Sequence, residues 1–255
     1  MPFELVTVPC LSDNYAFLAH DHASGKTLLV DAPEARPIIK ALADRGWILS
    51  DIILTHHHLD HVQGLNEILS VHSARVIGAL ADKNRLPPLD VEVSENDRIS
   101  VGTQTGRVFD VSGHTIGHIA VYFEDSKLLF TADSLMALGC GRLFEGSAEQ
   151  MWESLSKLAN LDPETKVCSG HEYTIANGRF ALTIEPQNAK LQNRIKTITN
   201  LRAKGAPTVP SVLLEELETN PFLRPKSENI RKNLKLQNAS ETQVFAEIRS
   251  RKDNF

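Results

Sequence analysis

The feature that most constrains this chain is a cluster of histidines that directly follows an apolar run. Residues 55–61 read Thr-His-His-His-Leu-Asp-His and contain four of the ten histidines of the chain. The preceding run, Ile52–Leu54, predicts a buried strand, and an amphipathic helix is expected over His61–Leu69. Ligand sites in α/β proteins lie at the carboxyl ends of strands, so the cluster stands where such a site is expected.

The spacing within the cluster predicts a metal site. Residues two apart in an extended chain point to the same side, so His56 and His58 share one side of the chain. Asp60 and His61, at the start of the helix, are expected to turn back toward the same side. Three imidazoles and one carboxylate are a suitable donor set for zinc, iron or manganese. Crowding these groups at a strand end would be costly without a cation to bind them.

Two other members of the cluster receive different interpretations. His57 alternates away from its neighbours, so we expect it to support the site or to be exposed. Leu59 is expected to pack inward as an apolar anchor.

Three later segments repeat the same arrangement of a strand followed by a ligand residue. They are Gly113–His118, Thr131–Asp133 and Ser169–Glu172. They offer His114, Asp133 and His171, and together with the first cluster they could complete a site for two metals. We expect His118 to pack against the site or to support one of its ligands. His20, His22 and His72 lie in no motif.

The chain divides into two regions by its pattern. Up to residue 173, short apolar runs that predict strands alternate with amphipathic helices, which is typical of a mixed α/β fold. Beyond it the strand signal fades, and proline-punctuated helical patterns follow. They predict helices over Thr174–Ile184, Asn188–Lys204, Ser211–Leu217, Glu228–Leu236 and Glu241–Arg251. We therefore expect an α/β domain over 1–173 and an all-helical domain over 174–255.

Composition excludes several classes of protein. A chain of 255 residues can bury a large core without disulfides or a partner subunit, so we expect a monomer. No apolar run approaches 18 residues, so no membrane span is expected. The N-terminus has no secretory pattern and the three cysteines are scattered, which favours the cytoplasm. The net charge of −5 argues against binding of nucleic acid.

The charge is unevenly distributed. Residues 1–173 carry a net charge of −11, and residues 174–255 carry +6. A basic region of this kind fits a small anionic substrate, although a solvated helical surface would give the same charge.

Two sets of motifs carry a family resemblance. His-x-His-x-Asp-His, Gly-His-Thr-x-Gly-His and the later Asp133 and His171 resemble the metallo-β-lactamase superfamily. Four further segments are 139–146 (Gly-Cys-Gly-Arg-Leu-Phe-Glu-Gly), 170–174 (Gly-His-Glu-Tyr-Thr), 220–224 (Asn-Pro-Phe-Leu-Arg) and the C-terminal 249–255. Within the superfamily, these four resemble the type II glyoxalases, the hydroxyacylglutathione hydrolases. The resemblance covers essentially the whole chain.

The resemblance implies a fold, a metal centre and its ligands. The fold would be an αββα sandwich followed by a smaller helical domain. The centre would hold two divalent ions, zinc above all, with iron or manganese as alternatives. The first ion would be bound by His56, His58 and His114, the second by Asp60, His61 and His171, and Asp133 would bridge both. Asp60 and Asp133 would also act in catalysis, because they would hold a hydroxide between the two ions.

The resemblance also implies the substrate. The enzyme would cleave S-D-lactoylglutathione to glutathione and D-lactate, the second step of methylglyoxal detoxification. The glutathione part would be bound by Arg142, Phe144, Tyr173, Arg249 and Lys252. Arg142 stands where many members have Lys, and Phe144 where some have Tyr, so hydrogen bonding differs there.

The residues themselves favour a thioester as substrate. A thiolate whose conjugate acid has a pKa of about 8.5 leaves without a strong general acid, and none is evident. No Gly-x-Ser-x-Gly segment offers a serine nucleophile, and Cys140 has no His–acid pair to activate it. The alternatives are another enzyme of this fold, such as a glutathione persulfide dioxygenase, a lactonase or a nuclease, or a non-catalytic metal-binding protein.

Overall fold

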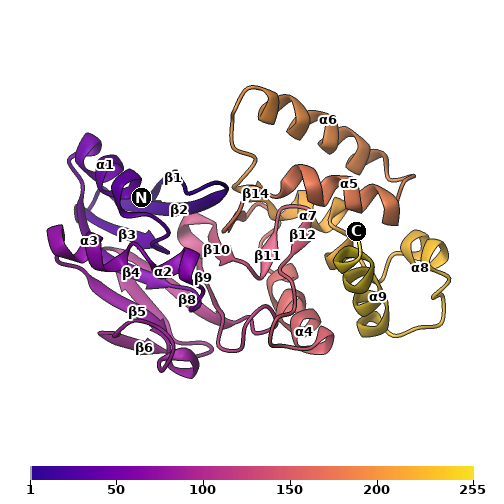
Figure 1. Cartoon of the computed structure of the whole chain (residues 1–255), viewed down its shortest axis with the longest axis horizontal. Helices are drawn as coiled ribbons and strands as arrows, with labels where there is room; N and C mark the ends of the chain where they lie inside the picture. Colours follow the sequence, from indigo (N-terminus) through magenta and orange to yellow (C-terminus); the bar gives the residue numbers. More distant parts are fainter. Residues whose placement is uncertain (1) are drawn as a thin grey trace. The chain divides into compact units, whose positions relative to one another are not determined.

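The computed structural model describes residues 2–255 and contains two compact units. The first unit comprises the residues up to Asp110 together with Ile116–Ala132. The second comprises Val111–Thr115 and Asp133–Phe255. Figure 1 labels most of the helices and strands of both units.

A sheet of six strands forms the first layer of the first unit. Its strands are β1 (Glu4–Cys10), β2 (Asn14–Asp21), β3 (Lys26–Val30), β4 (Ile48–Leu54), β5 (Arg75–Ala79) and β6 (Val91–Val93), and they lie in that order. β1, β2 and β3 pair antiparallel, whereas β3 to β6 pair parallel. The carboxyl ends of β3 and β4 are therefore neighbours in the sheet.

Helices α1 (Ala35–Arg45) and α3 (Leu65–Val71) cover this sheet. In α1 the buried positions Ile38 and Leu42 lie one turn apart and join a cluster with Ile68 of α3 and Leu29 of β3. Gly46 ends α1 in the left-handed conformation, with φ of 64°, which glycine adopts without steric cost.

The predicted helix over His61–Leu69 is wrong as a single element. The structure has α2 (Leu59–Val62) and then α3, with Gly64 between them. The backbone N–H of Gly64 donates to the Ala32 carbonyl oxygen at 2.8 Å, and a Cβ at Gly64 would lie 2.9 Å from that oxygen. The break therefore comes from a close approach of two loops, which periodicity alone does not reveal.

The second sheet of this unit contains β7 (Arg98–Val101), β8 (Gln104–Asp110), β9 (Ile119–Phe123) and β10 (Leu128–Ala132). Each pairs antiparallel with the next. The two sheets pack face to face, since the ring of Phe17 in β2 lies 5.8 Å from that of Phe130 in β10. A short 3-10 turn at Leu80–Asp82 follows β5, and another at Glu124–Ser126 follows β9.

A buried carboxylate joins turns of the two sheets. Asp21 accepts hydrogen bonds from the Thr103 backbone N–H and the Ser24 hydroxyl, both at 2.7 Å. Burial alone would raise the pKa of Asp21, but these hydrogen bonds outweigh it and hold the pKa below its usual range. A Cβ at Gly102 would overlap the Asp21 carboxylate, so this contact also requires glycine there.

The second unit is mainly helical. Its helices are α4 (Ala148–Ala159), α5 (Thr174–Ile184), α6 (Ala189–Ala203), α7 (Leu213–Thr219), α8 (Glu228–Leu234) and α9 (Glu241–Asp253), with a 3-10 turn at Pro221–Leu223. Its strands are β11 (Leu135–Met136), β12 (Gly139–Cys140), β13 (Lys166–Ser169) and β14 (Ser211–Val212). Ser147 and Ser240 begin α4 and α9 with capping boxes, each closed by a glutamine three residues on.

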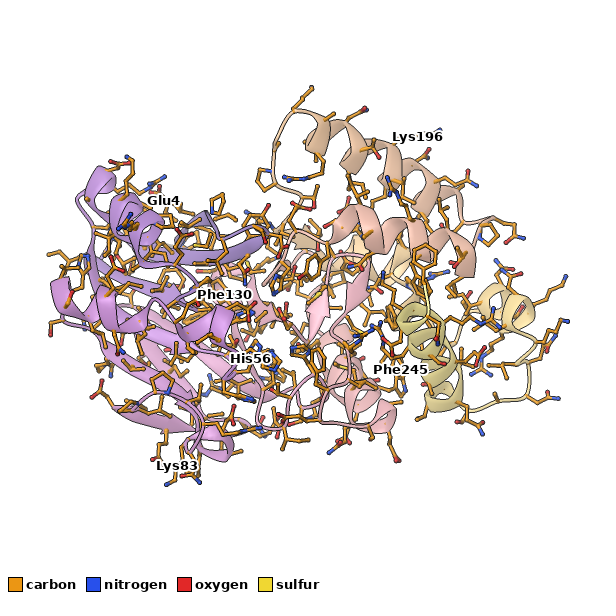
Figure 2. The ribbon with its side chains drawn as sticks, viewed as in Figure 1. Glu4, His56, Lys83, Phe130, Lys196 and Phe245 are labelled. Atoms are coloured by element: carbon orange, nitrogen blue, oxygen red, sulfur yellow. The ribbon has the colours of Figure 1, made fainter. Side chains whose placement is uncertain are left out.

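Aromatic packing holds these helices together. The ring of Phe222 lies 6.0 Å from Phe180 and 5.7 Å from Phe245, and Trp152 of α4 lies 6.0 Å from Phe245. Figure 2 shows Phe245 on α9. The predicted helix Thr174–Ile184 is confirmed, whereas Ser211–Val212 is a strand and α7 begins only at Leu213. No helix within residues 2–255 has both the length and the apolar character to span a membrane.

Candidate metal centre

The histidine cluster leaves the end of β4 in extended conformation and turns into α2. His58 occupies the N-cap position with φ of −60° and ψ of 140°. Nε2 of His56 lies 3.1 Å from Nδ1 of His58, and the rings of His56 and His61 lie 4.3 Å apart. His56 and His61 are fully buried. The spacing therefore brings three imidazoles together, as expected for His56 and His58 on one side of the chain.

Asp31 determines which ring nitrogens of this cluster are available to a metal. It follows β3, and its carboxylate accepts from the Thr55 hydroxyl at 2.9 Å and contacts Nδ1 of His61 at 2.7 Å. A carboxylate accepts only, so Nδ1 of His61 carries the proton. The Thr55 hydroxyl gives its proton to Asp31, so it accepts from Nδ1 of His56 at 3.0 Å. Both histidines are thus left with Nε2 as the ligand atom.

Sequence reasoning missed Asp31. The signal was available, because Asp31 follows a buried strand in the same manner as the predicted ligands, and β3 pairs in parallel with β4. Its backbone is in the left-handed region with φ of 57°, which is uncommon for a residue other than glycine. The Thr55 backbone N–H donates to the same carboxylate at 2.9 Å. These hydrogen bonds keep Asp31 in that conformation.

Asp60 is held by a second residue that sequence reasoning missed. The side-chain amide of Asn14 donates to the Asp60 carboxylate at 2.9 Å and to its backbone carbonyl at 3.1 Å. The carboxylate then lies 3.8 Å from Nε2 of His61. Asn14 therefore fixes the rotamer of one proposed ligand.

Three further residues in or near the cluster have other environments. Nδ1 of His57 lies 2.9 Å from the buried Asp82 carboxylate, and its ring meets that of His58 edge-on at 5.1 Å. His118 is buried and stacks on the ring of His56, with centroids 4.5 Å apart and planes 15° apart. The expected inward packing of Leu59 is wrong, because its side chain is 70% exposed at the first turn of α2.

The second unit brings its own three predicted ligands together. The Asp133 carboxylate lies 3.5 Å from Nε2 of His114 and 3.2 Å from Nε2 of His171. All three residues are at most 6% exposed. Nδ1 of His114 contacts the Arg142 carbonyl oxygen at 2.8 Å, and a carbonyl only accepts, so this nitrogen carries the proton. His114 therefore also offers Nε2 as its ligand atom.

Each of these three predicted ligands follows a strand, as expected. Asp133 comes directly after β10, His171 follows β13 by two residues, and His114 lies in the loop after β8. Aromatic rings fix the imidazoles, since Tyr173 stacks on His171 at 4.7 Å and Phe144 meets His114 edge-on at 5.3 Å.

The residues expected to bind glutathione have different environments. Phe144 and Tyr173 are 61% and 40% exposed. Arg142 is exposed, with Nε 3.4 Å from the Asp253 carboxylate. Lys252 lies over the rings of Phe180 and Phe255, at 5.3 and 5.4 Å. Burial, with Arg249 as a second cause, lowers the pKa of Lys252.

Arg249 is the one member of this group that is buried. Its guanidinium donates to the Cys140 carbonyl oxygen at 3.0 Å and to the Asp253 carboxylate at 2.8 Å, and it lies over the ring of Phe222. In this structure Arg249 supports the backbone next to Arg142, in addition to any role toward an anion.

The three cysteines do not form a nucleophilic site. Cys10, Cys140 and Cys168 are free and buried. Burial raises the pKa of the Cys10 thiol to about 12 and that of Cys140 to about 11, and it also raises that of Cys168. Cys140 is therefore a structural residue, as expected from its sequence context.

The donor set and the fold together define the class of protein. The model of the metallo-β-lactamase superfamily matches residues 13–171. Among solved structures, ETHE1 from Myxococcus xanthus has a TM-score of 0.69 at 23% identity, covering 98% of this chain and 90% of its own. The BLEG-1 B3 metallo-β-lactamase has a TM-score of 0.66 at 21% identity, covering 87% of this chain and 100% of its own. The expected metallo-β-lactamase fold, with a helical C-terminal region, is confirmed.

Similarity over the whole length of the chain identifies the narrower family. Residues 172–255 match the model described as hydroxyacylglutathione hydrolase C-terminus. The chain is 60% identical over 255 residues to the hydroxyacylglutathione hydrolase of Roseobacter denitrificans, covering all of both chains. It is 52% identical to that of Methylococcus capsulatus, covering 99% of this chain and 98% of the relative. The chain belongs to the hydroxyacylglutathione hydrolase family.

Proposed function

We propose that the protein hydrolyses S-(2-hydroxyacyl)glutathione thioesters, S-D-lactoylglutathione above all, to glutathione and the 2-hydroxy acid. The observation that carries this proposal is the hydrogen bonding of three predicted metal-binding histidines. His56, His61 and His114 each have Nδ1 occupied by a carboxylate, hydroxyl or carbonyl oxygen, so each presents Nε2 to a metal. The relatives named above support the choice of substrate.

The residues fit divalent metal ions. We propose that two ions, zinc in the first place, are bound by His56, His58, Asp60, His61, His114, Asp133 and His171. The buried imidazoles and the carboxylates of Asp60 and Asp133 are the neutral and anionic donors such ions require. When bound, a pair of divalent ions supplies an acidified water and a polarised thioester carbonyl. Two carboxylates offset part of the charge of the two ions.

The chain's own residues then position the reaction. Asp133 contacts two histidines, so it is the residue best placed to bridge two ions. Asn14 orients the Asp60 carboxylate, and Asp31 orients His61. The departing thiolate of glutathione is stable near neutral pH, because its conjugate acid has a pKa of about 8.5, and no side chain needs to donate a proton to it.

The glutathione part of the substrate is the proposed ligand of Arg142, Phe144, Tyr173, Arg249 and Lys252. The positive charges of Arg142 and Lys252 would attract the carboxylates of such a peptide. Arg249 already pairs with Asp253. A substrate carboxylate would therefore compete with Asp253 for Arg249, whereas the Lys252 ammonium lies over two aromatic rings.

We further propose a boundary between a metal-binding domain over 1–173 and a substrate-binding helical domain over 174–255. The junction of the two family matches at residues 171 and 172 supports this boundary. The free buried thiols are typical of a reducing compartment, so we propose that the enzyme acts in the cytoplasm, as a monomer and without nucleic acid.

The test is release of free thiol from S-D-lactoylglutathione, followed before and after chelation and after the return of zinc. We expect turnover that is lost on chelation and restored by the metal. Oxygen uptake with glutathione persulfide and no thiol release from the thioester would instead favour a persulfide dioxygenase. A protein that binds metal and turns over neither compound would refute the proposal.

A further inference from the structure

The hairpin over residues 133–142 serves the metal centre at both of its ends. Asp133 begins it and contacts His114 and His171. Arg142 ends it, and its carbonyl oxygen accepts a hydrogen bond from Nδ1 of His114. A shift of this hairpin would therefore move one proposed ligand and change the hydrogen bonding of another.

The base of the hairpin leaves no free space. The Gly141 backbone N–H donates to the Ser134 carbonyl oxygen at 3.1 Å. A Cβ at Gly141 would overlap the Asp133 carbonyl oxygen and would lie 2.9 Å from His114 Nδ1. Any displacement of the tip is therefore transmitted to the residues at the base.

Two side chains at α7 hold the tip, and the Asn177 amide of α5 also donates to the Ala137 carbonyl oxygen there, at 3.1 Å. The two at α7 are Glu216 and Asn220. The Glu216 carboxylate of α7 accepts from the Leu138 backbone N–H at 2.8 Å. The Asn220 amide donates to the carbonyl oxygens of Met136 and Gly139, at 3.1 and 3.0 Å. Both side chains are fully buried. Strands β11 and β12 contain only two residues each, so these external bonds supply much of the order of the tip.

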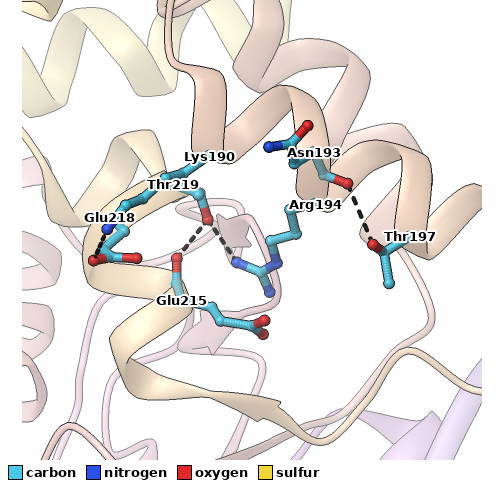
Figure 3. Close-up of a pocket in the computed structure, with 7 residues that line it drawn as sticks. All are labelled: Lys190, Asn193, Arg194, Thr197, Glu215, Glu218 and Thr219. Atoms are coloured by element: carbon cyan, nitrogen blue, oxygen red, sulfur yellow. Dashed lines mark hydrogen bonds and ion pairs between the residues drawn. The ribbon is translucent and has the colours of Figure 1, made fainter.

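The Glu216 carboxylate is itself fixed by a cation. Arg194 of α6 donates to Glu216 and, at 2.7 Å, to the hydroxyl of Thr219. Figure 3 shows Arg194 with Thr219 and Glu215 in a pocket of about 350 Å³ between α6 and α7. Leu138, which donates to it, has φ of 56°, a conformation that persists only where surrounding contacts impose it.

We propose that Glu216 and Asn220 are positioning residues for the metal centre, acting through the 133–142 hairpin on Asp133 and on the tautomer of His114. The helical region then does more than bind substrate, because it also sets the geometry of metal ligands. This inference rests on the proposed metal centre and is independent of which substrate is cleaved.

The test compares Glu216→Gln and Asn220→Ala with a matched control, Glu185→Gln. Glu185 is likewise buried, pairs with Arg224 at 3.0 Å and accepts from Ser227 at 3.0 Å, but it does not contact the hairpin. Co²⁺ is the probe. Its affinity is measured by competition with a chromogenic chelator, its visible absorption spectrum reports ligand geometry, and urea unfolding of the metal-free protein gives stability.

We expect Glu216→Gln and Asn220→Ala each to weaken Co²⁺ binding about 10-fold and to alter its spectrum. Glu185→Gln should lose comparable stability but keep the parent affinity and spectrum. Where the parent hydrolyses thioester, kcat should fall with KM little changed. Parent-like Co²⁺ affinity and spectra in both variants would overturn the inference. If Glu216→Gln does not fold, the Co²⁺ affinity and spectrum of Asn220→Ala alone decide whether the inference stands. A parent that binds Co²⁺ without hydrolysing thioester would refute the proposed function alone.

Discussion

Replacing Asp31 by asparagine should weaken metal binding without removing any metal ligand. The side-chain oxygen of the new amide can still accept from the Thr55 backbone N–H. Its nitrogen, however, would face the Thr55 hydroxyl and His61 Nδ1, which are both donors in the parent. His61 can relieve this conflict only by moving its proton to Nε2. That tautomer restores a hydrogen bond and removes the lone pair that the metal needs.

The expected loss of metal affinity in Asp31→Asn follows from the hydrogen bonds that are lost. Two hydrogen bonds to a charged group are each worth about 1.5–3 kcal/mol, so retaining the original tautomer is costly. Loss of a group that orients a metal-bound histidine typically lowers affinity about 10–100-fold. This corresponds to about 1.4–2.7 kcal/mol of binding free energy.

The assay is competition for zinc against a chromogenic chelator, together with urea unfolding of the metal-free protein. The control is Asp51→Asn, because Asp51 is a fully buried carboxylate in β4 that accepts from Arg75 Nε at 2.8 Å. Asp51→Asn should lose stability and keep its zinc affinity. If Asp31→Asn binds zinc as the parent does, the argument from tautomers is refuted.

The remaining predictions concern a bridging ligand, the basic tail and acid stability. Asp133→Ala should lower metal content to one ion per chain or fewer and reduce turnover by orders of magnitude, whereas His57→Ala should keep its metal, as elemental analysis would show. Lys252→Ala should raise KM more than it lowers kcat for a glutathione thioester, and much less for one lacking the glycine carboxylate; Lys252 is the sharper probe because Arg249 also supports the backbone. Asp21→Asn should lower the free energy of unfolding at pH 7. Because folding depresses the pKa of Asp21, its contribution is present above the unfolded pKa of about 3.9 and is lost below it, so urea unfolding should show the gap to the parent narrowing toward pH 3.

The parts of the molecule set by local spacing were predictable. The two-residue step from His56 to His58 brings their nitrogens to 3.1 Å, and the apolar pattern of 174–184 predicts α5 at its observed bounds. Both depend on residues close in the chain. The placement of Asp133 and His171 just after strand ends was predictable for the same reason.

The parts set by distant contacts were not predictable from one sequence. The break at Gly64 depends on a much earlier loop, since Gly64 bonds to Ala32. Glu216 reaches a backbone N–H 78 positions away, and Asn14 reaches Asp60 over 46. Leu59 is exposed because residues two apart in a helix face different sides, and His61 occupies the buried side of α2.

The burial of all three thiols has a consequence for a protein whose proposed substrate is a thioester. Thioesters transfer their acyl group readily to thiolates, so an exposed cysteine of ordinary acidity would become acylated by substrate. With a pKa of about 11, Cys140 is only about one part in 10⁴ thiolate at pH 7. Cys10 is still less ionised, with its pKa near 12. The chain thus offers its substrate no sulfur nucleophile, and the acyl group can pass to water without modifying the catalyst.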